Sequence, residues 1–167
     1  MKKIVRDYVQ ENAKFLALNC QTNSNNYGFN IINRQYRKVD SLSLDQTEIS
    51  LAVGKRSMNF ANEMQQLQDN MVAKYGWLTR GGAETIGTMK GENPVFCPSL
   101  ETNIVDTIGA GDAFCSLASL TAVLGLPLFT STFIGQLAGA QAVRIVGNSL
   151  PIQKQKFLKA AESLLNF

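Results

Sequence analysis

The stretch "DTIGAGDAF", residues 106–114, decides the fold and raises the main question about function. Gly109, Ala110 and Gly111 stand directly before the carboxylate of Asp112 and a long apolar segment. The first amide groups of a helix have no partner within the helix, and the helix dipole adds partial positive charge there. Small residues would leave these amides open to an anion such as a phosphoryl group. The pattern also fits a tight turn into a buried helix, in which Asp112 is an ordinary first-turn carboxylate.

The segments around this turn predict alternating helices and strands. Helical patterns occupy 2–13, 29–36, 45–54, 58–75, 112–124, 127–146 and 152–165, the last with Ser149 and Pro151 as start signals. Strand patterns occupy 14–20, 38–44, 76–82, 83–89 and 93–99, with a loop at 21–28. This alternation indicates one α/β domain over 1–167, with three layers and helices on both faces of a mostly parallel sheet. Gly135 and Gly139 cost helix stability, so they are expected to allow close packing.

Composition limits the possible functions. The chain has 167 residues, of which 45% are hydrophobic and 17% charged, so it is long enough for a globular core. The net charge is only +3, with scattered Lys and Arg, which gives no indication of nucleic-acid binding. The three cysteines have no metal-site spacing and are expected to be core thiols. With no signal peptide or membrane-spanning segment in the sequence, we expect a soluble, cytoplasmic protein without a membrane partner.

Histidine is absent from the sequence. Ser-His-Asp catalysis, Cys-His catalysis and His-ligated metal sites are therefore excluded within this chain. A general base must instead be a carboxylate, a lysine, a tyrosine or an activated cysteine. Phosphoryl transfer depends mainly on positioning and electrostatic stabilisation, so an aligned carboxylate is a sufficient base for that reaction.

The longer motif resembles the C-terminal signature of the ribokinase (PfkB) family of carbohydrate kinases. Three further segments are similar to motifs of that family, namely "VDSLSLDQTEISLAVG", "WLTRGG" and "LAGAQAVRIVGN". Together they extend the resemblance over nearly the whole chain. It implies a ribokinase-like fold and the transfer of a phosphoryl group from ATP to a sugar hydroxyl.

The resemblance implies a role for each residue that matches the motifs. Asp112 would be the base that takes the proton from the sugar hydroxyl, and Gly109, Ala110 and Gly111 would form the anion hole. Thr79 and Gly81 would border the phosphates and ribose, and Asn148 would lie near the adenine.

Two metal sites follow from the same resemblance. Asp106, the carbonyl of Ile108 and Gly147 would belong to a monovalent-cation site that binds K⁺. Asp45 and Glu48 would help to hold Mg²⁺ through water, although the family usually has Asn at the position of Asp45. The same two residues also fit a capping box, in which they stabilise the start of the helix over 45–54.

Members of this family carry an additional N-terminal part, with an early Gly-Gly, lid strands and the aspartate that holds the sugar. This chain has no Gly-Gly before Gly81. We therefore expect a nucleotide-binding half that lacks the N-terminal part and the lid, reaches a sugar or sugar phosphate only through the missing half, and phosphorylates little or no sugar alone. The sheet edge left unpaired would favour a homodimer. The alternative is a catalytically inactive nucleotide-binding or dimerisation module derived from such a kinase.

Overall fold

In the part of the chain that the structure describes, five strands form one sheet in the order β1–β2–β3–β4–β5. The structure is a computed structural model that describes residues 1–22, 25, 27–28 and 31–166. The strands are β1 (Ala17–Asn19), β2 (Ser41–Asp45), β3 (Tyr75–Thr79), β4 (Glu84–Met89) and β5 (Val95–Pro98). Neighbours β1, β2 and β3 are parallel, whereas β4 is antiparallel to both β3 and β5. Four of the five strands therefore run in the same direction, in a mixed sheet.

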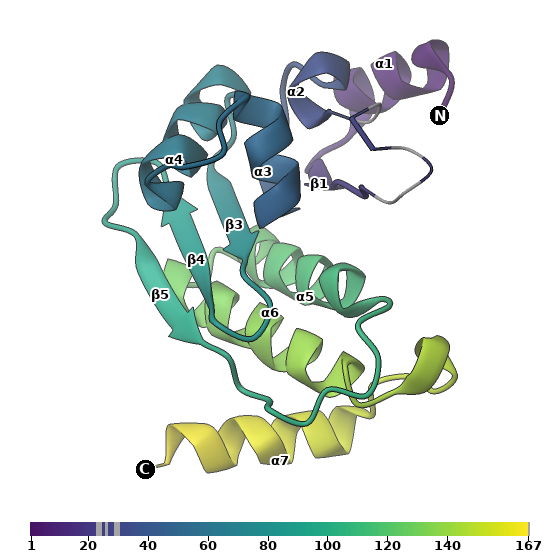
Figure 1. Ribbon diagram of the computed structural model, residues 1–167, viewed down its shortest axis with the longest axis vertical. Helices are drawn as coiled ribbons and strands as arrows, with labels where there is room; N and C mark the ends of the chain where they lie inside the picture. Colours follow the sequence, from purple (N-terminus) through teal and green to yellow (C-terminus); the bar gives the residue numbers. More distant parts are fainter. Residues whose placement is uncertain (23–24, 26, 29–30, 167) are drawn as a thin grey trace.

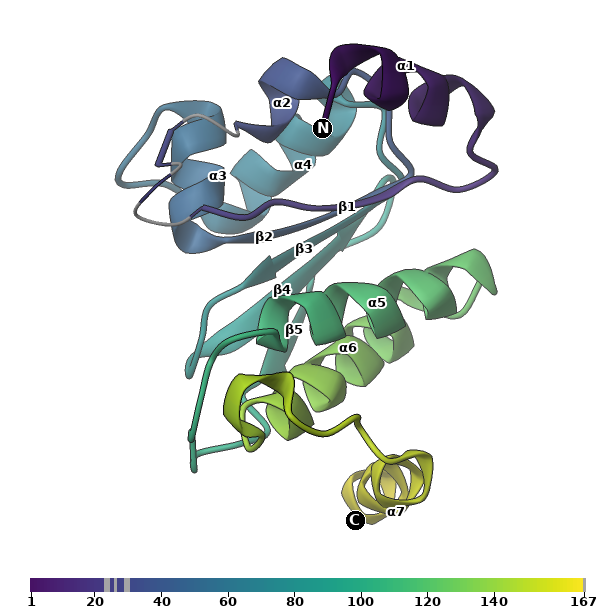
Figure 2. The ribbon, with the colours of Figure 1, turned by 90° about the vertical axis from the view of Figure 1, so that its right-hand side faces the viewer.

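Helices cover both faces of this sheet, which confirms the predicted three layers (Figures 1 and 2). The helices on one side are α1 (Lys3–Asn12), α2 (Ile32–Gln35), α3 (Gln46–Val53) and α4 (Phe60–Asn70). The other side carries α5 (Ala110–Val123) and α6 (Leu128–Ala142), with α7 (Lys154–Leu165) packed outside α6. No helix in the described part of the chain is long and apolar enough to cross a membrane.

Strand β3 shows how the sequence produces a hydrophobic core on each face of the sheet. Tyr75 and Trp77 face α5 and belong to a cluster with Phe114, while Leu78 belongs to the cluster on the α4 side with Met64. A strand buried on both faces has to be apolar at nearly every position, and β3 is. Each large side chain buried in this way contributes about 1.5–3 kcal/mol through the hydrophobic effect. The central strands therefore fix the position of the helices on both faces.

The predicted element order is confirmed, but several boundaries are wrong. The helix expected over 58–75 ends at Asn70, because Val72 has a left-handed φ of 56° and the amide of Ala73 turns back to the carbonyl of Gln68 at 2.8 Å. This turn frees the chain to enter β3. The strand expected over 14–20 is paired only over Ala17–Asn19. The loop at 21–28 and the start of the helix at 29–36 lie partly outside the described residues.

The C-terminal boundaries also differ from those expected. The helix over 127–146 ends at Ala142 and is followed by a 3₁₀ turn, η1 (Val146–Asn148). Ser149 ends this turn and does not cap α7, whose N-cap is Gln153. The predicted start signals at Ser149 and Pro151 were therefore wrong, and the helix expected from Asp112 begins two residues earlier, at Ala110.

The structure confirms the prediction that Gly135 allows close packing, here of α5 on α6. A Cβ atom at this position would lie 2.8 Å from the Cβ of Ala118 and 2.9 Å from the ring of Phe114. Gly139 is less constrained, since its Cβ would lie 3.6 Å from the nearest atom, the carbonyl oxygen of Ala110.

We predict opposite effects for Gly135→Ala and Gly139→Ala on the free energy of unfolding. Gly135→Ala forces α5 and α6 apart and should lower stability by about 1–3 kcal/mol. Gly139→Ala has room for the methyl group and should raise stability by about 0.5–1 kcal/mol, because glycine is a poor helix former. Urea denaturation of both variants tests the difference, and equal effects would contradict the packing described here.

Candidate active site

An open cleft of about 730 Å³ lies where the carboxyl ends of β1, β2 and β3 meet the start of α5. Its lining comprises Asn19–Thr22, Ser43–Glu48, Thr79–Gly81, Thr107–Gly109, Gly111 and Asp112. A narrower cavity of about 160 Å³ shares Thr79, Gly81, Thr107 and Gly111 with the cleft. Its other lining residues are partly apolar, such as Phe114, and partly polar, such as Thr85 and Gln136. In open α/β sheets the carboxyl ends of the strands are the usual place for ligands. The two cavities together form the candidate site.

The start of α5 presents bare backbone to this cleft. Gly109 is its N-cap, with a left-handed φ of 81° and no side chain that could accept hydrogen bonds from the first amides. The amide of Ala113 bonds to the carbonyl of Gly109 at 2.9 Å, so the helical hydrogen bonds begin there. A Cβ atom at Gly111 would meet nothing within 4 Å. The amides of Gly111 and Asp112 thus have no partner in the helix, and both residues line the cleft, which fits an anion.

Asp112 lies in the first turn of α5 and is held from a distant strand. Its Oδ1 accepts a hydrogen bond from Nδ2 of Asn19 at 2.6 Å, although the two residues are 93 positions apart. Its other carboxylate oxygen has no such contact with Asn19. Asn19 was not among the predicted site residues. In the sequence, only its place near the end of a strand pattern distinguishes Asn19, because its contact with Asp112 is tertiary.

Asp106 ties the loop before α5 to η1. Its Oδ1 accepts from the amide of Ile108 at 3.0 Å and its Oδ2 from the amide of Gly147 at 2.7 Å. These two bonds lower the pKa of the Asp106 carboxyl below its ordinary value. The structure therefore brings together the three residues predicted for a monovalent-cation site. Asn148 lies against Gly109, where its side chain leaves no room for a Cβ atom, and it lines neither cavity.

Asp45 and Glu48 form the capping box that their spacing predicted. The amide of Glu48 donates to Oδ1 of Asp45, and the amide of Asp45 donates to Oε2 of Glu48, both at 2.8 Å. The amide of Thr22 donates to the remaining oxygen of Glu48 at 3.0 Å. Burial raises the pKa of Glu48 to about 7. Both carboxylates face the cleft, but three of their four oxygens are engaged with backbone amides.

Direct metal coordination receives no support from this cluster. The described residues contain no group of three or more His, Cys, Asp or Glu side chains that could hold a metal ion. Burial and the charge of Glu48 raise the pKa of Cys20 to about 11, so its thiol stays protonated at neutral pH. A Mg²⁺ ion at this place would take most of its ligands from water and phosphate, as is common for this ion.

Thr79 and Gly81 border both cavities from the end of β3. Thr79 Oγ1 donates to the carbonyl of Leu44 at 3.4 Å, which is a weak bond, and a Cβ atom at Gly81 would meet nothing within 4 Å. The structure thus places both residues opposite the start of α5, across the shared part of the site.

Comparison with known proteins identifies the family. Residues 11–155 match the model of the pfkB family carbohydrate kinases. The chain belongs to this family. No curated protein sequence matches it.

Solved structures with this fold include two kinases. Phosphofructokinase-2 from Escherichia coli in complex with substrates and products superposes with a TM-score of 0.79 at 16% identity, over 99% of this chain and 53% of that one. Ribokinase from Arabidopsis thaliana, complexed with ribose and ATP, gives 0.74 at 22% identity, over 95% and 51%. The fold is therefore ribokinase-like, and the chain spans about half the length of these relatives.

The raised pKa of Glu48 predicts how stability depends on pH. The folded state binds this proton more tightly than the unfolded state, whose pKa is near the ordinary value of 4.5. The stabilisation that Glu48 contributes should therefore be complete below pH 4.5, decline as the pH rises to about 7, and change little above that. Glu48→Gln should remove this component, so that the difference in unfolding free energy between wild type and variant varies over that range. Parallel pH profiles from urea denaturation would contradict the assignment.

Proposed function

We propose that this chain is the C-terminal, nucleotide-binding portion of an ATP-dependent sugar kinase. The observation that carries the proposal is the open start of α5, where unpartnered amides lie beside the carboxylate of Asp112 in a cleft. Membership of the pfkB family supports phosphoryl transfer to a carbohydrate. The cleft has the size usual for a small-molecule site.

The residues at the start of α5 have separate roles in the proposed reaction. The backbone of Gly109, Ala110 and Gly111 binds the transferring phosphoryl group, whose oxygens gather negative charge in the transition state. Asp112 accepts the proton of the attacking sugar hydroxyl. Asn19 holds one oxygen of this carboxylate at 2.6 Å, which leaves the other to meet the hydroxyl.

The narrower cavity suits the base of the nucleotide, because Ile104, Phe114 and Val143 give its lining apolar surface against which a ring can pack. Thr79 and Gly81 then border the ribose and phosphates, and Asn148 lies near the adenine in this proposal. ATP supplies the phosphoryl group, and Mg²⁺ neutralises its charge when bound. Asp45 and Glu48 would hold Mg²⁺ only through water, since their oxygens are largely engaged in the capping box.

A monovalent cation such as K⁺ is proposed beside Asp106, the carbonyl of Ile108 and Gly147. The support is the clustering of these residues around an exposed carboxylate with a lowered pKa. A related structure, phosphofructokinase-2 from Escherichia coli, is described in complex with potassium.

The alternative function is nucleotide binding without catalysis. It is favoured by the length of the chain, which covers about half of the related kinases. Transfer requires both reactants to be held together. We therefore expect binding of ATP by this chain and little or no phosphorylation of sugars by it alone.

Gly111→Val is predicted to weaken binding of an ATP analogue by roughly 100-fold or more. The added side chain would fill the space in front of the α5 amides, so the terminal phosphate would lose its donors. Isothermal titration with Mg²⁺ and K⁺ present measures the affinity.

Ser116→Val is the matched control for this experiment. It places the same side chain five residues further along α5, outside both cavities, and should leave the affinity unchanged. Unchanged binding in Gly111→Val would count decisively against an anion site at the start of α5.

Asp112→Asn is predicted to separate binding from catalysis. The amide keeps the size of the side chain and an oxygen acceptor for Asn19, so nucleotide affinity should change less than about threefold. Any transfer to a panel of sugars, or slow ATP hydrolysis, should fall by about 10²–10⁴-fold because the base is lost. Retained turnover in this variant would refute Asp112 as the base, whereas a wild type that binds ATP without any turnover supports the non-catalytic alternative.

A further inference from the structure

Ser43 carries a buried hydroxyl group at the inner end of the cleft. It stands in the middle of β2, is only 2% exposed, and has no hydrogen bond from its Oγ to any other described residue. Buried hydroxyl groups normally have such a partner. The fully enclosed side-chain polar atoms that lack one, in the part of the chain that the structure describes, belong to Arg6, Arg80 and Ser131. The Oγ of Ser43 is therefore not enclosed, and its remaining surface opens into the cleft that Ser43 lines.

The side chain of Ser43 faces α5. Side chains of a strand alternate between the two faces of the sheet. Leu42 and Leu44 belong to the hydrophobic cluster on the α4 side, whereas Oγ of Ser41 lies 3.2 Å from Oγ of Ser119 in α5. Ser43 shares the face of Ser41 and lies two residues, or about 7 Å, closer to the carboxyl end of the strand. It therefore lies on the α5 side of β2, on the way from the core to the cleft.

The neighbours of Ser43 in the sheet are residues of the candidate site. In the pairing of β1 with β2 it is opposite Asn19, whose side chain bonds to Asp112 at 2.6 Å. On its other side is β3, whose last residue, Thr79, borders both cavities. A triphosphate that runs from the narrower cavity past Thr79 to the α5 amides crosses the end of β2. The phosphate nearest to Asn19 and Asp112, and therefore to Ser43, is the terminal one.

The charges around the cleft leave the binding of a phosphate to neutral donors. The described lining residues include one cationic side chain and three carboxylates, those of Asp45, Glu48 and Asp112. The cationic side chain, Arg80, is engaged elsewhere, because it pairs with Glu84 and lies 5.0 Å from the centre of the Phe60 ring. A hydroxyl group can donate to an anion without leaving a buried charge when no anion is bound. The α5 amides and the hydroxyl of Ser43 are donors of this neutral kind.

We propose that the hydroxyl of Ser43 donates a hydrogen bond to the terminal phosphate of the bound nucleotide. It binds this phosphate from the side of the sheet, while the amides at the start of α5 bind it from the side of the helix. This inference rests on the proposed binding of ATP and is independent of catalysis. Strand β2 is paired on both sides, with β1 and β3, so the backbone that carries Ser43 is fixed and only the hydroxyl has to rotate toward the phosphate. Hydrogen bonds to a charged acceptor are stronger than those between neutral groups, so this contact favours ATP over a nucleotide without the γ-phosphate.

Ser43→Ala removes this donor and breaks no hydrogen bond among the described residues. The affinity for adenylyl imidodiphosphate, a non-hydrolysable ATP analogue, should fall by about tenfold or more, because a hydrogen bond to a charged group is lost. The affinity for ADP, which has no γ-phosphate, should change by less than about twofold, since its other contacts are kept. Isothermal titration of the whole chain with Mg²⁺ present measures both affinities. Urea denaturation should show that the variant is at least as stable as the wild type, because a buried hydroxyl without a partner is removed.

Ser41→Ala is the matched control on the same strand and the same face. Ser41 is as deeply buried as Ser43, but it lines neither cavity and its hydroxyl is bonded to Ser119. The variant should lower stability, because Ser119 loses this partner, and should leave both nucleotide affinities unchanged.

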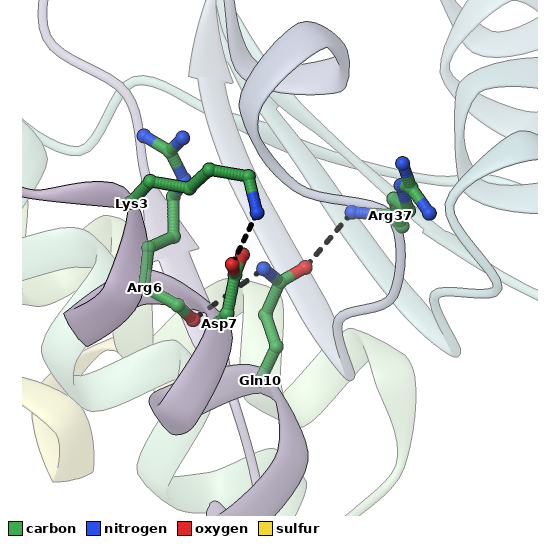
Figure 3. Close-up of polar contacts among 5 residues, drawn as sticks. All are labelled: Lys3, Arg6, Asp7, Gln10 and Arg37. Atoms are coloured by element: carbon green, nitrogen blue, oxygen red, sulfur yellow. Dashed lines mark hydrogen bonds and ion pairs between the residues drawn. The ribbon is translucent and has the colours of Figure 1, made fainter.

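Gln10→Ala is a second control, which removes a polar contact outside the site. Oε1 of Gln10 on α1 accepts from the amide of Arg37 at 2.9 Å (Figure 3), and neither residue lines a cavity of the site. Both affinities should again stay unchanged, which separates an effect on the phosphate from a general loss of stability.

The result that would overturn the proposal is an unchanged affinity for the ATP analogue in Ser43→Ala, while the wild type binds it. Nucleotide binding itself would then stand. A loss of affinity for ADP as large as that for the analogue would also overturn it, because Ser43 would not distinguish the terminal phosphate. A wild type that binds neither nucleotide would overturn this proposal and the proposed function together.

Discussion

Open amide groups at the start of α5 are the feature on which the rest of the site depends. Of the described helices, α3 and α5 both begin at the cleft, and they satisfy their first amides differently. In α3 the side chain of Asp45 accepts from the amide of Glu48, an N-cap that typically stabilises a helix by about 1 kcal/mol. In α5 the cap is Gly109, whose left-handed backbone brings no acceptor. The start of α5 therefore lacks the stabilisation that a capping side chain would give. Its free amide donors and its dipole can act on a bound anion instead.

The conformation of this start is fixed by contacts between distant segments. Asp106 bonds to the amide of Gly147, and Asn148 lies against Gly109, so the loop before α5 and the turn after α6 hold each other. On the other side, Asn19 reaches Asp112 from the end of β1. Ordering a loop costs about 1–2 kcal/mol per residue in backbone entropy, and these bonds offset part of that cost before any ligand arrives. The candidate site is thus largely preformed.

The sequence predicted those features whose cause is local. The capping box follows from two side chains three positions apart, and β3 follows from a run that is apolar on both faces. The turn at 109–112 could also be predicted, because a run of small residues directly before a carboxylate is typical of an open helix start. The contact between Asn19 and Asp112 could not, since nothing in either segment encodes a bond across 93 positions. The early end of α4 was missed for a similar reason, because a left-handed φ at Val72 is imposed by the path into β3. Periodicity predicted a helix over 2–13, but it could not show which side of α1 faces the protein.

Asn19 connects the sheet to the proposed chemistry. Its backbone belongs to β1, while its side chain holds one oxygen of Asp112. A strand of three residues that bonds to a single neighbour within the described chain is weakly held, so the position of the Asn19 side chain depends on how firmly β1 is packed. Phosphate binding by the α5 amides needs only the start of α5, whereas the orientation of the base also depends on β1. On these proposals the anion site and the aim of the carboxylate are therefore set by different segments of the chain.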